Sequence, residues 1–234
     1  MRTIGIIGAM EEEISFLREK MDIVTTKSVV GLTYYVGRYE GNNVVLVKSG
    51  IGKVNAAVCT QAMIDHFGVD YIINTGVAGG LSPELHVGDI LISVDAVQHD
   101  MDTSAFGDPI GVIPRMAESY FKADEALVEL AQEAAKTCGL DCRIITGRVA
   151  SGDQFIATQE AREKICKTVK GDCAEMEGAA IAHACWLNRI PFLIIRAISD
   201  SANEDAGMSF DEFCVMAAQR SSLLTETMIA AMKN

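Results

Sequence analysis

Residues 3–13 read TIGIIGAMEEE. The apolar run Thr3–Ile7 and the glycine that follows it predict a short buried strand that ends in a turn. Helical periodicity begins at Glu11 and continues to Lys20. A strand that turns directly into a helix is the repeating unit of an α/β fold.

Strands and helices continue to alternate downstream. We expect strands at Leu32–Tyr39, Val44–Lys48, Tyr71–Asn74, Asp89–Val94, Arg143–Val149 and Phe192–Ile198, the first two joined as a hairpin through Gly41-Asn42. We expect helices at Gly52–Phe67, Ala123–Cys138, Thr158–Lys167, Glu177–Leu187 and Phe210–Met232. The pattern predicts one α/β domain over residues 1–234, with three α/β/α layers and a central mixed, largely parallel sheet flanked by helices. Residues 95–120 have little periodicity and predict a long irregular excursion.

The composition limits the possible partners. Hydrophobic residues make up 49% and charged residues 22%, which is typical of a globular core-forming chain. The net charge of -12, without a basic cluster, predicts no binding to nucleic acid or to an anionic membrane. Without a signal-peptide layout or a long apolar run, we expect a cytoplasmic protein. The seven cysteines show no zinc-site spacing and are interpreted as reduced thiols, with no metal.

The sequence does not match the common cofactor-binding and catalytic motifs. Gly5–Gly8 lacks the GxGxxG spacing of a dinucleotide fold, and Gly50–Lys53 lacks the first glycine of a phosphate loop. The four histidines form no HExxH pair, and no serine lies in a GxSxG elbow. We therefore expect no cofactor.

Glu13 is the carboxylate that periodicity selects. Acidic residues in a first helical turn stabilise the helix dipole, which accounts for a Glu11–Glu13 run. Glu13, however, lies three residues after Met10 and four before Leu17, on the apolar stripe of the predicted helix. A carboxylate on a buried stripe is costly unless it has partners or a function.

Glu177 and Asp200 are two further acidic residues that could contact a ligand. Glu177 precedes the small-residue helix start Gly178–Ala180, which permits close approach, and its carboxylate could accept two hydrogen bonds from a vicinal diol. It could equally be a helix-start residue that complements the dipole. Asp200 follows the apolar strand Phe192–Ile198, at the end of a strand where α/β sheets bind ligands, although Ser199-Asp200 could also be a simple turn.

Together with Gly76–Gly80 and Ser151–Ile156, these residues resemble the methylthioadenosine/S-adenosylhomocysteine nucleosidases. The resemblance covers essentially the whole chain, in order, through residues 4–13, 48–53, 74–76, 78–80, 175–177, 196–200 and 209–213. One departure is Val77, where the family often has a serine.

The resemblance implies hydrolysis of the N-glycosidic bond of 5′-methylthioadenosine and S-adenosylhomocysteine by a cytoplasmic homodimer, with 5′-deoxyadenosine as an additional candidate substrate. Asp200 would protonate adenine N7 and Glu13 would activate water, while Glu177 would bind the ribose hydroxyls. The resemblance further assigns substrate contacts to Gly79, Met176 and Ser199, to Phe155 and Ile156 at the adenine, to Met10, Ile51 and Phe210 around the 5′-thio group, and to Phe106 from a second subunit.

Three alternatives stay open. A purine nucleoside phosphorylase would share the fold but would need arginines around its phosphate, and the first arginine after the opening turn is Arg18. An aminodeoxyfutalosine hydrolase would use the same catalytic groups with a different 5′ pocket. A non-catalytic nucleoside-binding protein would be favoured by loss of an acid, but Glu13, Glu177 and Asp200 are all present.

Overall fold

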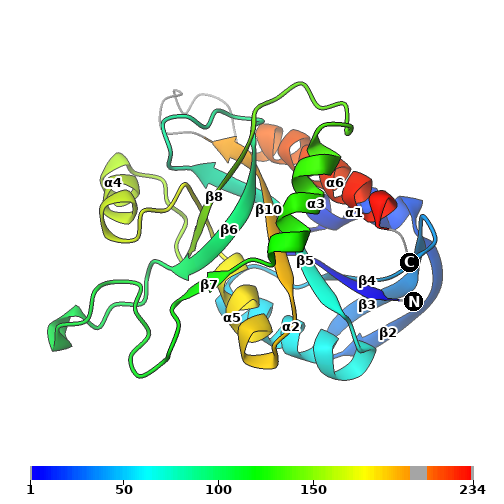
Figure 1. Cartoon of the computed structure of the whole chain (residues 1–234), viewed down its shortest axis with the longest axis horizontal. Coiled ribbons are helices and arrows are strands. Elements are labelled where there is room, and N and C mark those ends of the chain that lie inside the picture. Colours follow the sequence, from blue (N-terminus) through cyan, green and yellow to red (C-terminus); the bar gives the residue numbers. More distant parts are fainter. Residues whose placement is uncertain (1, 201–209, 233–234) are drawn as a thin grey trace.

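The structure is a computed structural model that describes residues 2–200 and 210–232 (Figure 1). Its strands are β1 (Thr3–Gly8), β2 (Asp22–Val29), β3 (Leu32–Tyr39), β4 (Asn42–Lys48), β5 (Tyr71–Gly80), β6 (Ile90–Gln98), β7 (Tyr120–Lys122), β8 (Ile144–Ser151), β9 (Cys173–Glu175) and β10 (Phe192–Asp200). Its helices are α1 (Glu11–Lys20), α2 (Lys53–Phe67), α3 (Glu125–Ala135), α4 (Gln159–Thr168), α5 (Gly178–Asn188) and α6 (Phe210–Ala231), with a short 3-10 helix η1 (Ser104–Phe106). No helix of the described ranges is long and apolar enough to cross a membrane.

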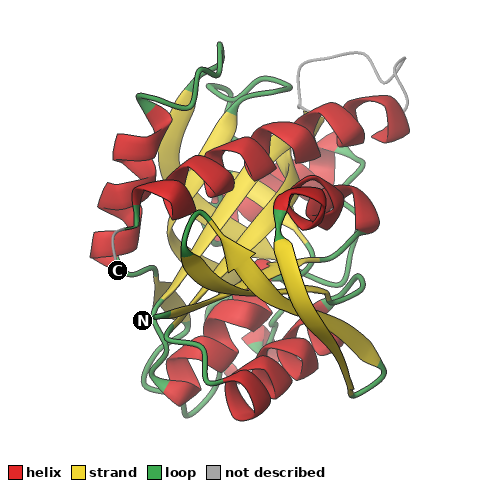
Figure 2. Cartoon of the chain, turned by 90° about the vertical axis from the view of Figure 1, so that its right-hand side faces the viewer, coloured by secondary structure: helices red, strands yellow, loops and turns green. Residues whose placement is uncertain are grey.

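One mixed sheet lies between two helical layers, as expected for the α/β class. Helices α1, α3 and α6 pack together on one face, and α2 packs with α5 on the other (Figure 2). The core strands β1, β4, β5 and β10 run parallel, whereas β2, β3 and β4 form an antiparallel ribbon. The flanked, mixed sheet predicted from the sequence is confirmed.

Part of the sheet closes on itself. Strand β10 pairs with both β5 and β6, and β6 continues through β8 and β9 back to β5. Gly79 near the end of β5 therefore pairs with Asp200 on one side and Ala174 on the other. This junction brings Gly79 of β5, Ala174 of β9 and Asp200 of β10 to one place.

The short strands β7 and β9 were not predicted, and three further differences between the predicted elements and the structure are instructive. Strand β2 was not predicted, because every residue from Asp22 to Ser28 is exposed and the strand has no apolar alternation. Strand β6 runs on to Gln98, so the irregular excursion begins later than position 95; a register shift between Ser93 and Asp95 interrupts the alternation there. Strand β5 continues through its glycines to Gly80 because it pairs closely with β9 and β10.

Helix ends follow local chemistry. Helix α2 ends at Gly68, whose φ of 60° is the left-handed conformation that glycine adopts without strain. Asp124 caps α3 by accepting a hydrogen bond from Leu127 N, and Thr158 caps α4 by accepting one from Ala161 N. The cap at Thr158 fixes the chain immediately after the segment that carries Phe155.

Candidate active site

A cavity of about 280 Å³ opens at the carboxyl ends of β1, β5 and β10. Nine of the residues predicted for the site line it, namely Met10, Glu13, Ile51, Gly79, Phe155, Met176, Glu177, Ser199 and Asp200. Ala9, Val77, Ala78, Ala174 and Glu175 complete the lining. Ligands of α/β proteins bind at this end of the sheet, which makes the cavity the candidate active site.

Three predicted residues are not part of this lining. Ile156 is partly buried and packs against the small core around Leu81 and Val169 instead. Phe106 lies on η1, far to the left in Figure 1, with 89% of its surface exposed. The side chain of Phe210 lies outside the described residues. The roles predicted for these three stay predictions.

Glu13 points into the cavity from the first turn of α1. Its Oε2 accepts hydrogen bonds from the backbone N–H groups of Ala9 (2.6 Å) and Met10 (3.0 Å), and its Oε1 accepts one from Val77 (3.0 Å). Burial raises the pKa of Glu13, against the opposing effects of Arg196 and of these bonds. The carboxyl is thus held in one orientation, and the inward position that periodicity predicted is confirmed by its 4% exposure.

Glycines let the carboxyls approach the strands. A Cβ built at Gly76 would clash with the Glu13 carboxyl, and one at Gly79 would lie 3.1 Å from Asp200 Oδ2. A larger residue at either position would displace an acid. The absence of side chains at Gly76 and Gly79 therefore leaves the space that the two carboxyl groups occupy.

Asp200 is the last residue of β10 and lines the same cavity as Glu13. Its Oδ2 accepts a hydrogen bond from Arg162 Nη2 at 2.7 Å, and its Oδ1 accepts one from Ser199 Oγ at 3.0 Å. With its side chain 30% exposed, Asp200 keeps access to solvent while two neighbours hold both oxygens. Such a group can exchange a proton with a bound ligand.

Glu177 occupies the N-cap position of α5 without a side-chain capping bond, and it is 7% exposed. Its Oε1 accepts a hydrogen bond from Gly52 N at 2.7 Å, which joins the loop before α2 to the cavity. Burial, followed by the negative charge of Glu175, raises the pKa of Glu177 to about 8. The residue thus stands at a helix start and also lines the cavity, and its contact with ribose hydroxyls stays a prediction.

A buried ion pair that sequence reasoning did not assign supports the site. Glu175 accepts hydrogen bonds from Arg196 Nη2 (2.6 Å), Gly178 N and Ser151 Oγ. Burial raises the pKa of Glu175, but Arg196 and these bonds outweigh it and hold that pKa below its ordinary value. Arg196 also donates to Asn74 Oδ1. The signal was present in the sequence, since a lone arginine inside the apolar strand 192–198 requires a buried counter-charge.

Removing one half of this pair should destabilise the protein strongly. Glu175→Gln would leave the Arg196 guanidinium buried and uncompensated, at a cost of about 3–5 kcal/mol in the free energy of unfolding. Urea unfolding followed by circular dichroism measures the loss. The control is Glu84→Gln, which breaks the exposed pair with Arg143 and should cost at most about 1 kcal/mol. Equal losses in the two variants would contradict the assigned role of the buried pair.

The raised pKa of Glu177 predicts a pH-dependent stability. The folded chain retains the Glu177 proton up to a pKa of about 8, whereas the unfolded chain releases it near 4.5. This group therefore favours folding most below pH 4.5, and that contribution is lost as the pH rises to about 8. Glu177→Gln should gain stability relative to the wild type between pH 5 and pH 9 by about 1 kcal/mol or more. For Glu118→Gln, at an exposed site, the difference in unfolding free energy from the wild type should not change with pH. A difference for Glu177→Gln that also did not change with pH would refute the shift.

The cavity is acidic. Glu13, Glu175, Glu177 and Asp200 line it, and the arginines nearest to them, Arg162 and Arg196, are already paired with Asp200 and Glu175. A neutral ligand that offers hydroxyls and ring nitrogens suits these carboxyls, and the described lining holds no arginine or lysine that would bind a phosphate dianion.

Comparisons with known proteins agree over the full length of the chain. A model of the phosphorylase superfamily matches residues 3–230. A 5′-methylthioadenosine/S-adenosylhomocysteine nucleosidase of Geobacillus kaustophilus (strain HTA426) is 46% identical over 231 residues, covering 98% of this chain and 97% of the relative. A nucleosidase of the same name from Treponema pallidum (strain Nichols) is 44% identical and covers 95% of this chain and 91% of its own.

Solved structures give the same result. A 5′-methylthioadenosine/S-adenosylhomocysteine nucleosidase of Neisseria meningitidis, in complex with methylthio-immucillin-A, superimposes with a TM-score of 0.93 at 42% identity, covering 99% of this chain and 100% of its own. A futalosine hydrolase of Helicobacter pylori strain 26695 superimposes with a TM-score of 0.92 at 37% identity, covering 99% and 98%. The family model, the full-length relatives and the shared fold lead to one conclusion: this chain belongs to the phosphorylase superfamily, in its 5′-methylthioadenosine/S-adenosylhomocysteine nucleosidase family.

Proposed function

We propose that this chain is an N-glycosyl hydrolase that cleaves 5′-methylthioadenosine and S-adenosylhomocysteine, releasing adenine and the 5-thio-substituted ribose. The observation that carries the proposal is the meeting of Glu13, Glu177 and Asp200 in one cavity of about 280 Å³. The full-length relatives that bear this nucleosidase name support it. 5′-Deoxyadenosine, which keeps the adenine and the ribose hydroxyls, is a further candidate substrate.

Asp200 and Glu13 carry out the two proton transfers of the reaction. Adenine leaves poorly as an anion, so a proton from the Asp200 carboxyl moves to N7 as the bond between N9 and C1′ breaks and its electron pair goes to the base. The sugar develops oxocarbenium character, and a water molecule attacks C1′ while its proton passes to Glu13. Glu13 is suited to receive that proton because three backbone N–H groups fix its orientation.

The remaining lining residues hold the substrate. Glu177 accepts hydrogen bonds from the 2′ and 3′ hydroxyls, and Met176 beside it lies against the sugar. Phe155, which is 63% exposed in this structure and lines the cavity, stacks on adenine. The backbone of Ile156 binds the edge of the base.

The 5′ substituent is assigned to the apolar end of the cavity. Met10 and Ile51 line this end, and Phe210 completes it in the proposal. Ile51 is 53% exposed and Phe106 is 89% exposed in the single chain, and a homodimer in which the partner subunit brings its η1 segment to this opening would cover both. The cytoplasmic location expected from the sequence stays a prediction.

Product analysis tests the proposal. Purified protein is incubated with 5′-methylthioadenosine, with and without phosphate, and free adenine and the sugar product are quantified. We expect adenine release that does not depend on phosphate, with free methylthioribose as the second product. Phosphate-dependent formation of a sugar 1-phosphate would reject the hydrolase in favour of a phosphorylase.

A second candidate substrate is favoured by one comparison. The Helicobacter pylori structure named as a futalosine hydrolase has the same fold at 37% identity. Aminodeoxyfutalosine therefore belongs in the same assay. A kcat/KM for it above those for 5′-methylthioadenosine and S-adenosylhomocysteine would reassign the preferred 5′ group and leave the cleaved bond unchanged.

A further inference from the structure

Arg162 on α4 contacts the ends of two strands at the candidate active site. Its Nη2 donates to Asp200 Oδ2 at 2.7 Å, and its Nη1 donates to the backbone oxygen of Gly80 at 3.2 Å. The side chain is only 11% exposed, so the guanidinium is largely withdrawn from water. A charge-assisted bond in this setting is stronger and better oriented than one at the surface.

The contact divides the two oxygens of Asp200 between different neighbours. Arg162 binds Oδ2, whereas Ser199 Oγ donates to Oδ1. The missing side chain at Gly79 lets the carboxyl lie against β5, since a Cβ there would be 3.1 Å from Oδ2. Because Arg162 is itself anchored on Gly80, it fixes the carboxyl relative to β5.

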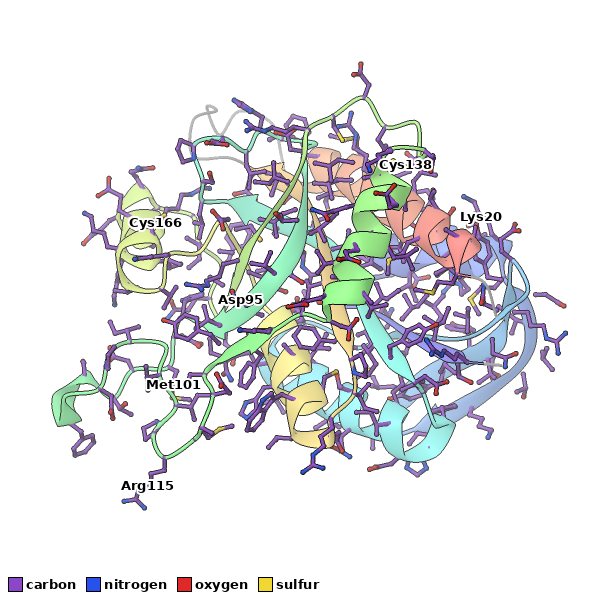
Figure 3. All side chains as sticks on the ribbon, in the orientation of Figure 1. Lys20, Asp95, Met101, Arg115, Cys138 and Cys166 are labelled. Carbon is purple, nitrogen blue, oxygen red and sulfur yellow. The ribbon has the colours of Figure 1, made fainter. Side chains whose placement is uncertain are left out.

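Helix α4 is well placed to hold this contact. Ile165, one turn after Arg162, is 4% exposed and packs in the core cluster with Leu81 and Ala174. Thr158 caps the same helix just after the segment with Phe155 and Ile156. Figure 1 shows α4 on the left, apart from the two helical layers, and Figure 3 labels Cys166 on the same helix. Arg162 therefore links the segment proposed to bind adenine to the acid proposed to protonate it.

We propose that Arg162 is a positioning residue for Asp200, which holds the carboxyl in the orientation needed to deliver a proton to adenine N7. Its positive charge also stabilises the carboxylate that is left after the proton has moved. This inference rests on the proposed function. It concerns a residue outside the cavity lining that bonds directly to Asp200.

Kinetics of Arg162 variants test the inference. Arg162→Gln should lower kcat for adenine release by about 10- to 100-fold, the range expected when a catalytic group is displaced by about 1 Å. KM should change by less than about threefold, because the groups that bind the sugar are untouched. Arg162→Lys keeps the charge and one donor and should recover part of the lost kcat.

A double-mutant cycle separates positioning from a structural role. If Arg162 acts through Asp200, Arg162→Gln should have almost no further effect in an Asp200→Asn background, measured at high enzyme concentration. The matched control is Arg143→Gln, which breaks a 2.6 Å pair with Glu84 away from the cavity and should leave kcat unchanged. An equal loss in both backgrounds, wild-type kcat in Arg162→Gln, or a lysine variant no better than glutamine would overturn the inference. Absence of adenine release by the wild type would instead reject the proposed function.

Discussion

Asp200→Asn is expected to lower kcat for adenine release by about 10²- to 10⁴-fold, the usual contribution of a general acid. The amide has nearly the shape of the carboxyl, but it cannot transfer a proton. Its oxygen would take the position of Oδ2, because its NH₂ group would meet the donor Arg162 Nη2 there. The NH₂ group would then face Ser199 Oγ, which can accept a hydrogen bond. Binding should therefore survive while the chemical step fails.

Steady-state kinetics and adenine binding by calorimetry separate these two effects. The dissociation constant for adenine should change much less than kcat. Asp95→Asn is the control, because Asp95 also pairs with an arginine, Arg148 at 2.7 Å, but lies outside the cavity lining. Its kcat should match the wild type. Near-normal turnover by Asp200→Asn would remove Asp200 from the acid role.

Sequence reasoning identified a site residue more clearly when the evidence lay in one helix than when the site depended on pairing between distant strands. Glu13 was found from helical spacing alone, because the residues that reveal it lie within two turns of the same helix. Glu177 and Asp200 were ambiguous from local pattern. Their meeting depends on β5 lying between β9 and β10, and pairings of that kind leave no trace in a short window of sequence.

The two ion pairs that sequence reasoning did not assign join residues that are far apart in the sequence. Glu175 and Arg196 are 21 positions apart, and Arg162 and Asp200 are 38 apart. Neither pair has a fixed spacing that a motif could encode, since the spacing depends on the lengths of the intervening strands and helices. The exposed strand β2 was missed for the opposite reason, because it is an edge strand with no buried face to produce an alternating pattern.

Glu13→Gln is expected to reduce kcat by about 10²- to 10⁴-fold, because the amide cannot accept a proton from the attacking water. The substitution also has a defined structural cost. Glu13 accepts hydrogen bonds at both oxygens, from Ala9 and Met10 at Oε2 and from Val77 at Oε1. A glutamine NH₂ group on either side would face a backbone donor, so at least one bond is lost, at about 1 kcal/mol. The fold should persist.

The control for Glu13→Gln is Glu12→Gln, which removes an exposed carboxylate from the same helical turn and should keep wild-type turnover. The pH profile adds a second readout. Because burial raises the pKa of Glu13, the wild-type kcat/KM should climb on its acidic side at a pH above the ordinary range of a glutamate. That climb should be absent in Glu13→Gln. A variant that kept both the climb and wild-type turnover would show that another group activates the water.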